Sequence, residues 1–313
     1  MIRRGALRAA GAALLAAFPA CLETNITPPP TGTDEGGVIV FASNRADNNY
    51  EIYRVGADGL GLRRLTHAPE SNDRSPVLSP DGSKIAWERE IATPSGDFTA
   101  VEIWTMNADG SAPRVAVRNG SFNRSPSWGP SGEIVFSSRL TGSDQIYRLA
   151  SGATDPVRLT TGGAADQYPR FSPDGQRIVF QSNRGLDFDI YVMNGDGSGV
   201  TNLTRLGGDD RFPTWTPDGS RIIWTRFEGD LNGFDLYSIS ASGGAPATVV
   251  ATEFNELAPS VSPDGSSVVY QTDRSPPFGL YIAPLAGGAG RALRPDNANS
   301  GGSDLGPWWG PAR

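Results

Sequence analysis

The chain has 313 residues, of which 19% are charged and 38% are hydrophobic, and it contains 39 Gly and 25 Pro. So many residues that bend the backbone favour a fold of many short elements and argue against long helices. The formal net charge of −7 argues against a nucleic-acid partner, because phosphate binding needs a basic surface.

The first twenty residues differ from the rest of the chain. Arg3, Arg4 and Arg8 precede an apolar run over residues 9–20 that contains no acid, a pattern typical of a secretory signal peptide. No later run reaches the roughly 18 to 20 apolar residues that a membrane helix needs. We therefore predict a signal peptide at 1–20, an exported chain, and a formal charge of −10 once the three arginines are removed.

The single cysteine of the chain, Cys21, directly follows this segment. The sequence Phe18-Pro19-Ala20-Cys21 resembles the lipobox of bacterial lipoproteins, which implies acylation of Cys21 and a membrane anchor in the periplasm or at the cell surface. Ordinary cleavage near Ala20, leaving a free thiol, is the alternative. The polar segment 21–37 lacks core-forming residues and is expected to be a flexible tether.

A short turn motif then recurs along the chain. Ser-Pro-Asp-Gly or a close variant occurs five times, and Gly310-Pro311 begins a sixth, truncated copy. The prolines of this motif are Pro80, Pro130, Pro173, Pro217, Pro263 and Pro311. They are separated by 50, 43, 44, 46 and 48 residues, a period typical of four-stranded propeller blades.

The segments around each turn predict the same four strands. A strand segment that ends in an aromatic residue recurs at 51–53, 102–104, 145–147, 189–191 and 235–237, and again at 279–281. Segment 38–66 supplies a second, third and fourth strand, whereas 305–310 supplies a first strand alone. Residues 38–313 are therefore predicted to form an all-β, six-bladed β-propeller of four-stranded antiparallel blades, closed by a composite blade from the N- and C-terminal strands.

One copy of the repeat carries a family resemblance. The series Phe-Ser-Pro-Asp-Gly, Ile-Val-Phe, Asp-Ile-Tyr-Val-Met-Asn and Asp-Gly-Ser at 171–198 resembles the repeat of the TolB propeller family, and the resemblance extends over 38–311. It implies a non-catalytic envelope lipoprotein whose channel face binds a protein or peptide, such as a Pal-like partner. Propeller parts of peptidases and of oligogalacturonate lyases belong to the same family, so an enzyme is an alternative.

The residue inventory limits the enzymatic alternatives. His67 is the single histidine and no Gly-x-Ser-x-Gly motif occurs, so neither a serine hydrolase nor a His- or Cys-based metal site is expected, and no cofactor is predicted. Segments 107–111 and 194–198 resemble the start of a calcium loop but lack its closing Glu, and we interpret them as turns. Two alternatives stay open: an enzyme acting on a carbohydrate or peptide with Asp166 and Asp210 as acid and base, and small-molecule or calcium binding in the channel.

A ring of polar residues is the candidate binding site. In every predicted blade a hydrogen-bond acceptor stands three residues before the proline of the first strand, namely Asp73, Asn123, Asp166, Asp210, Glu256 and Asp304. The loops between second and third strands contribute Arg45, Arg89, Arg139, Arg184, Arg226 and Arg274. These residues either bind a partner at the channel mouth or serve the fold, each acceptor capping its own turn or pairing with an Arg of a neighbouring blade.

The longest departures from the repeat are expected on the same face of the propeller. They are the loops 46–49, 90–100, 227–233 and 275–277. Insertions on one face of a repeat protein usually mark its binding side.

Overall fold

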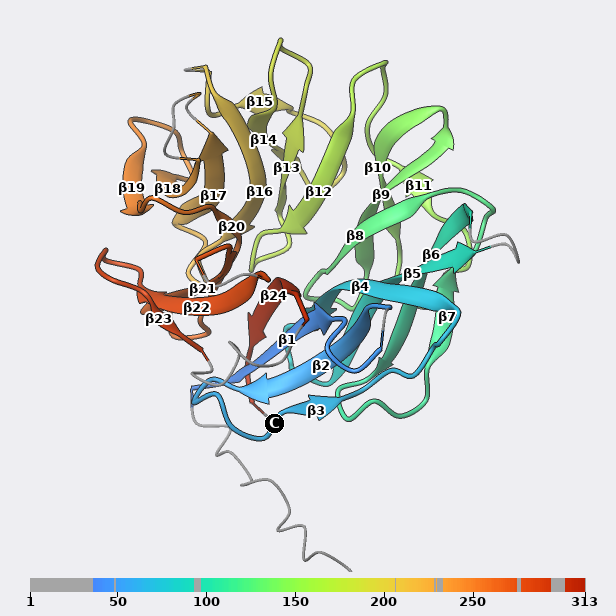
Figure 1. The fold of residues 1–313 in the computed structure, drawn as a ribbon. Helices are drawn as coiled ribbons and strands as arrows, with labels where there is room; N and C mark the ends of the chain where they lie inside the picture. The colour runs from blue at the N-terminus through green and yellow to red at the C-terminus, as the bar shows by residue number, and fades with distance from the viewer. Residues whose placement is uncertain are drawn as a thin grey trace, which may run out of the picture.

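The computed structural model describes residues 36–47, 49–92, 97–205, 207–227, 229, 233–274, 277–293 and 302–312. Regular structure in this part of the chain consists of 24 strands in six antiparallel sheets of four strands each. Figure 1 shows the six sheets arranged as blades around a central axis. The prediction of a six-bladed propeller is confirmed, whereas the predicted signal peptide, Cys21 and tether residues 21–35 lie outside the described residues.

The blades are numbered here along the chain, with strands given from the axis outward. Blade 1 is β24 (Asp304–Gly310), β1 (Val38–Ser43), β2 (Glu51–Gly56) and β3 (Arg63–Arg64), and blade 2 is β4 (Ser71–Leu78), β5 (Lys84–Ala92), β6 (Phe98–Asn107) and β7 (Arg114–Val117). Blade 3 is β8 (Asn123–Trp128), β9 (Ile134–Thr141), β10 (Ser143–Leu149) and β11 (Val157–Arg158), and blade 4 is β12 (Asp166–Phe171), β13 (Arg177–Ser182), β14 (Asp189–Asn194) and β15 (Thr201–Asn202). Blade 5 is β16 (Asp209–Trp215), β17 (Arg221–Phe227), β18 (Phe234–Ser240) and β19 (Ala247–Val250), and blade 6 is β20 (Glu256–Val261), β21 (Ser267–Thr272), β22 (Gly279–Pro284) and β23 (Arg291–Ala292).

The core lies between neighbouring blades. One buried cluster joins Val40 and Ile52 of blade 1 to Ile85 and Trp87 of blade 2, and equivalent clusters follow around the ring. Each blade also pairs an aromatic of its second strand with one of its third, as in Phe41 and Tyr53, whose ring centroids are 5.9 Å apart. Large flat side chains therefore fill the space between the sheets and bury most of the apolar area.

The two ends of the chain close the ring in blade 1. Strand β24 pairs antiparallel with β1, with Ile39 opposite Trp309 and Val40 opposite Trp308, and Figure 1 shows the red C-terminal strand beside the blue N-terminal ones. The indole Nε1 of Trp309 donates to the carbonyl of Gly36 at 2.8 Å, and its backbone N–H donates to Ser260 Oγ of blade 6 at 2.9 Å. The composite blade predicted from the sequence is therefore present, and it is bonded to its neighbour.

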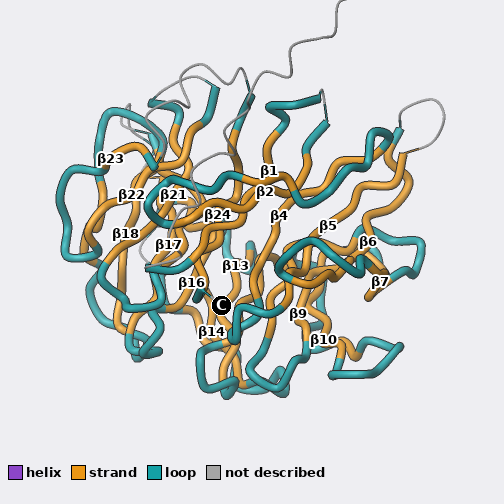
Figure 2. Tube along the Cα trace, turned by 90° about the horizontal axis from the view of Figure 1, so that it is seen from below, coloured by secondary structure: helices purple, strands orange, loops and turns teal. Residues whose placement is uncertain are grey.

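The strands define two faces of the molecule. Figure 2 shows the strands running between two groups of loops. We call the side where the first strands begin the mouth face, and the side that carries the Ser-Pro-Asp-Gly turns the turn face. In one such turn Asp174 Oδ1 accepts from Ser172 Oγ and from the Gln176 N–H, and Gly175 adopts φ 71°. A Cβ on Gly175 would lie 2.7 Å from Pro130 of the preceding blade, so this glycine is required by both the turn and the packing between blades.

Removing the Trp309 side chain should weaken closure of the ring. Trp309 is 8% exposed and belongs to a core cluster shared by blades 1 and 6. We expect Trp309→Ala to lower the free energy of unfolding by about 3–5 kcal/mol through the cavity it leaves, and Trp309→Phe to lower it less. Urea denaturation measures both, with the fully exposed Leu186 replaced by Ala as control. A loss for Trp309→Ala no larger than that of the control would contradict the proposed closure.

Candidate functional site

The six acceptors predicted from the sequence lie in the innermost strands, at or near where each begins. Their side chains are not open to the channel, because none is more than 1% exposed. None of these acceptors, and none of the six predicted arginines, belongs to the wall of the cavity at the mouth face. Their role in partner binding stays a prediction, and their geometry shows what else they do.

In four blades the acceptor is an aspartate held by the predicted arginine of the same blade. The pairs are Asp304 with Arg45, Asp73 with Arg89, Asp166 with Arg184, and Asp210 with Arg226. In blade 5 the Arg226 Nε and Nη2 donate to the two oxygens of Asp210 at 2.7 and 2.8 Å. The same guanidinium lies 5.4 Å from the ring centroid of Tyr237. Arg89 and Arg226 lie within the second strands, and not in the loops after them as predicted, whereas Arg45 and Arg184 lie in those loops. Each clamp therefore joins the first strand of a blade to the second strand or to the loop after it, and covers an aromatic of the third strand.

These four pairs match the structural alternative in kind, although the arginine comes from the same blade and not from a neighbouring one. Burial raises the pKa of Asp73 above its ordinary value, and the hydrogen bonds from Arg89 offset part of that effect. Burying each aspartate–arginine pair therefore costs desolvation free energy. The pairs fix the geometry of their blades more than they add to the free energy of unfolding.

Blades 3 and 6 depart from the clamp. In blade 3, Asn123 accepts from Ser138 Oγ and donates to the Val101 carbonyl, while Arg139 pairs with Asp144. In blade 6, Glu256 accepts from Thr252 Oγ1 at 2.7 Å, and its second oxygen has no hydrogen-bond partner among the described residues. The arginine of that blade, Arg274, lies over aromatic rings.

A cavity of about 300 Å³ opens at the mouth face, within the ring of first strands. Every first strand carries a β-bulge there, at the residue before its proline. That residue has positive φ, between 50° and 55°, in all six blades: Ser75, Ser125, Tyr168, Phe212, Ala258 and Gly306. Five of the six line the cavity, Ser125 being the exception.

The repeated bulge is a backbone constraint that five of the six blades meet without glycine. A non-glycine residue at positive φ costs about 1–3 kcal/mol, and the cost is greatest for bulky residues such as Tyr168 and Phe212. Hydrogen bonds hold some of these bulges: the Phe212 N–H donates to Gln181 Oε1 at 2.9 Å, and the Gly306 N–H donates to Gln271 Oε1 at 2.7 Å. In both cases the acceptor comes from the preceding blade, so the strained ring is also a contact between blades.

A cation and an indole close the floor of the cavity. Arg170 of β12 and Trp308 of β24 belong to opposite blades, and the guanidinium carbon of Arg170 lies 5.2 Å from the Trp308 ring centroid. Both residues also line a second cavity, of about 310 Å³, on the turn face. The contact therefore divides the channel into two blind cavities.

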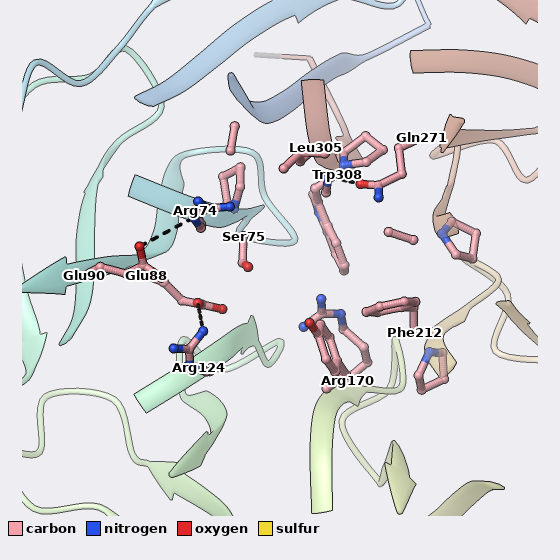
Figure 3. Close-up of a pocket in the computed structure, with 18 residues that line it drawn as sticks. Arg74, Ser75, Glu88, Glu90, Arg124, Arg170, Phe212, Gln271, Leu305 and Trp308 are labelled. Atoms are coloured by element: carbon pink, nitrogen blue, oxygen red, sulfur yellow. Dashed lines mark hydrogen bonds and ion pairs between the residues drawn. The ribbon is translucent and has the colours of Figure 1, made fainter. Parts of the chain in front are cut away.

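Charged groups gather on one wall of the mouth cavity, and Figure 3 shows them facing Arg170, Phe212 and Trp308. Arg74 lies 3.6 Å from Glu90, and Arg124 lies 4.0 Å from Glu88. Burial raises the pKa of Glu88 above its ordinary value. It also raises the pKa of Tyr168 to about 12 and lowers that of Arg170 to about 10.

Sequence reasoning missed the residues of this cavity. The motif that located the acceptors also contains the positive-φ residues, two positions further along each strand. Arg170 follows the proline of its strand, where the other blades have Val77, Ser127, Thr214, Ser260 and Trp308. Arg170 and Trp308 are the two large side chains at a position that holds smaller residues in the other blades. This difference between the blades was the feature of the sequence that could have identified them.

Other features singled out in the sequence are placed as follows. His67 is exposed in the loop after β3, and residues 107–111 and 194–198 form turns between third and fourth strands. Each of the four long loops predicted to mark the binding side contains residues outside the described part of the chain. Among the described residues no group of three or more His, Cys, Asp and Glu side chains could hold a metal ion, and no helix is long and apolar enough to cross a membrane.

Breaking a buried clamp should destabilise the fold. Arg226→Met leaves Asp210, which is fully buried, without its cation, and we expect a loss of about 3–5 kcal/mol in the free energy of unfolding. The matched control is Arg139→Met, because Arg139 is 54% exposed in its pair with Asp144 and should cost about 1 kcal/mol or less. Equal losses in urea denaturation would show that the clamps do not act as described.

The blade 6 acceptor should make stability depend on pH. Burial raises the pKa of Glu256 from its ordinary 4.5 to about 7, against the lowering effects of Thr252 and Arg274. The folded protein binds the Glu256 proton more tightly than the unfolded chain does, so protonation adds to the free energy of unfolding. This contribution is complete below pH 4.5 and is lost as the pH rises through about 7.

We therefore expect Glu256→Gln to raise the thermal midpoint relative to the native chain at pH 8, and to raise it less or not at all at pH 5. Glu253→Gln, at a nearby exposed residue, is the control and should change neither midpoint. A difference between Glu256→Gln and the native chain that does not grow between pH 5 and pH 8 would contradict the assignment.

Comparison with known proteins agrees with this architecture. Residues 164–312 match the family model described as the TolB beta propeller domain. A TolB homolog of Chlorobium chlorochromatii is 35% identical over 153 residues, which are 48% of this chain and 32% of that protein. A Tol-Pal system protein TolB of Francisella tularensis is 29% identical over 159 residues, 50% of this chain and 35% of the relative. The match thus spans about a third of the length of these curated relatives.

The fold of a solved relative extends the likeness over most of the chain. The crystal structure of TolB from Acinetobacter baumannii superposes with a TM-score of 0.72 over 90% of this chain and 68% of that one, at 22% identity. The repeats and the six closed blades make the chain a six-bladed β-propeller, and these matches show that it is similar to the TolB-like propeller family.

Proposed function

We propose that this chain is a non-catalytic cell-envelope lipoprotein whose mouth cavity binds a protein or peptide partner. The observation that carries the proposal is the blind cavity at the mouth face, walled by the strained bulges and closed below by Arg170 and Trp308. Strained backbone that recurs around one cavity is more common at binding sites than elsewhere. The Tol-Pal system named for one relative supports an envelope partner.

The proposal includes export and anchoring. Residues 1–20 have the pattern of a signal peptide and Cys21 stands at its end, so the mature chain would begin with an acylated cysteine. The described chain begins at Gly36, whose carbonyl is bonded to Trp309 at one end of the composite blade. A tether of about fifteen residues would then leave the propeller at its turn face, where β24 ends, and the mouth face on the opposite side would stay open to a partner.

The hydrolytic alternative finds no support in the carboxylates first considered for it. Asp166 and Asp210 are fully buried, and each is held by an arginine of its own blade. A general acid needs a reachable carboxyl group with a raised pKa. Neither residue reaches the cavity, so the binding function is the one that the geometry supports best.

Photo-crosslinking in living cells tests the proposal. A benzoylphenylalanine at Leu305, which lines the cavity and is labelled in Figure 3, should form one dominant adduct with an envelope protein. The same residue at Val157, 60% exposed on the outer strand β11, is the control and should not form that adduct.

The native chain should fractionate with membranes and incorporate a labelled fatty acid, and Cys21→Ala should do neither.

Two results would count against the proposal. The absence of an adduct at Leu305, or the same adduct at both positions, would remove the mouth cavity as the binding site. A native chain that stays soluble and unlabelled would remove the lipid anchor while leaving the binding proposal standing.

A further inference from the structure

Arg170 is a guanidinium whose positive charge has no acidic partner. Its Nη1 donates to the carbonyls of Ser125, Pro126 and Pro169 at 3.3, 2.9 and 3.2 Å. Nε and Nη2 make no hydrogen bond with any described residue, and neither is fully buried in the wall between the two cavities that Arg170 lines. No carboxylate among the described residues lies within 4.0 Å of this side chain, although Glu88 acts on it through space. Two parallel N–H donors thus stay available at the floor of the cavity.

The other charges of the cavity nearly cancel. Arg74 and Arg124 face Glu90 and Glu88 at 3.6 and 4.0 Å, which are ion-pair separations longer than a hydrogen bond. Arg74 Nε and Glu90 Oε2 are buried and make no hydrogen bond with the described residues. With all five side chains ionised, three arginines and two glutamates leave one positive charge. A ligand with a single negative charge would neutralise the site, whereas a doubly charged phosphate would overshoot it.

The shape of the site favours a planar anion on an uncharged stem. The Trp308 ring covers one side of the guanidinium, whose central carbon lies 5.2 Å from the ring centroid, and a guanidinium covered in this way binds an anion through the edge that carries its free N–H groups. Beside it Tyr168 and Phe212 meet edge to face with ring centroids 4.7 Å apart, and these rings give the cavity an apolar wall. A carboxylate matches the two parallel donors of a guanidinium fork, and its methylene stem would contact the rings.

We propose that the floor of the mouth cavity is a subsite for one carboxylate of an acidic peptide, held in bidentate fashion by Arg170 over Trp308. This inference rests on the proposed function, because it names the chemical group by which the bound partner is recognised. The carboxylate can come from an acidic side chain or from a C-terminus, and both present the same two oxygens. A bound carboxylate would also give the Arg170 guanidinium the acidic partner that no described residue supplies.

A titration with blocked tripeptides tests the subsite on the folded propeller. The probes are acetyl-glycyl-glutamyl-glycinamide, its neutral glutaminyl analogue, and acetyl-triglycine with a free C-terminal carboxylate. The readout is the NMR signal of the Trp308 indole N–H, assigned by its loss in Trp308→Phe. We expect saturable shifts with the glutamyl peptide, the free-acid peptide or both, and an affinity at least tenfold lower for the glutaminyl analogue. Which acid binds more tightly identifies the source of the carboxylate.

Substitution of Arg170 distinguishes the effect of its two parallel N–H donors from the effect of its positive charge. Arg170→Lys keeps the positive charge but loses the parallel donors, and it should weaken binding of the preferred peptide at least fivefold. Arg158→Lys, on the exposed outer strand β11, is the matched control and should leave the affinity unchanged. Thermal midpoints check that each variant is folded, and the comparison of glutamyl with glutaminyl peptide on the native chain does not depend on any variant.

Several outcomes would overturn the inference. They are equal affinity for the glutamyl and glutaminyl peptides, no saturable shift with either acid, or inorganic phosphate binding more tightly than both acids. These outcomes do not bear on the proposed function itself. If the tripeptides fail while Leu305 still crosslinks to an envelope partner and Val157 does not, the cavity binds its partner through another group.

Discussion

Closure of the ring is the constraint on which the rest of the molecule depends. The innermost strands contact one another in the cycle β24, β4, β8, β12, β16, β20 and back to β24. The channel exists because that cycle is complete, and it is completed by a few residues at the end of the chain paired with β1. Arg45 and Asp304 are 259 residues apart in sequence and meet in one clamp because of this pairing. Opening blade 1 would expose a strand edge and two core clusters, and it would also separate Trp308 from Arg170.

The narrow axis explains why polar groups and strain accumulate where they do. Six innermost strands crowd around one axis, and each of them bulges at the residue before its proline. The bulge re-aims the following side chains and frees a backbone N–H. Glu88, Gln181 and Gln271 of the preceding blades accept the freed N–H of Ser125, Phe212 and Gly306, respectively. Strain at the axis is thus held by hydrogen bonds between blades.

The sequence predicted what repeats and missed what differs between repeats. The turn prolines predicted the blade count and the composite blade, and the acceptors and arginines pair in four cases, although within one blade and not between neighbouring blades as expected. The sequence could not tell that these residues are buried, because burial depends on how far the first strand extends before it bulges. The positive φ of Tyr168 and Phe212 follows from six strands crowding one axis, which no local pattern encodes. Blade 6 has the same acceptor position, but its longer Glu256 is bonded to Thr252 and not to Arg274, a difference of one methylene that changes the partner.

The division of the channel bears on what kind of ligand suits it. An open channel admits a strand or a flow of solvent, whereas a floor made by Arg170 and Trp308 from opposite blades stops a ligand after a short depth. A blind cavity of about 300 Å³ takes the tip of a peptide and not its length, so the affinity of such a complex depends on the groups at the bottom. Glu90 and Glu88 neutralise the charges of Arg74 and Arg124, so these two arginines would add little to the affinity for an anion. Arg170 has no such balance, and its carbonyl accepts from the Trp215 indole at 3.1 Å, a contact that helps to hold its backbone in place without a ligand. Preorganisation of the single unbalanced cation is therefore what would distinguish an acidic tip from a neutral one.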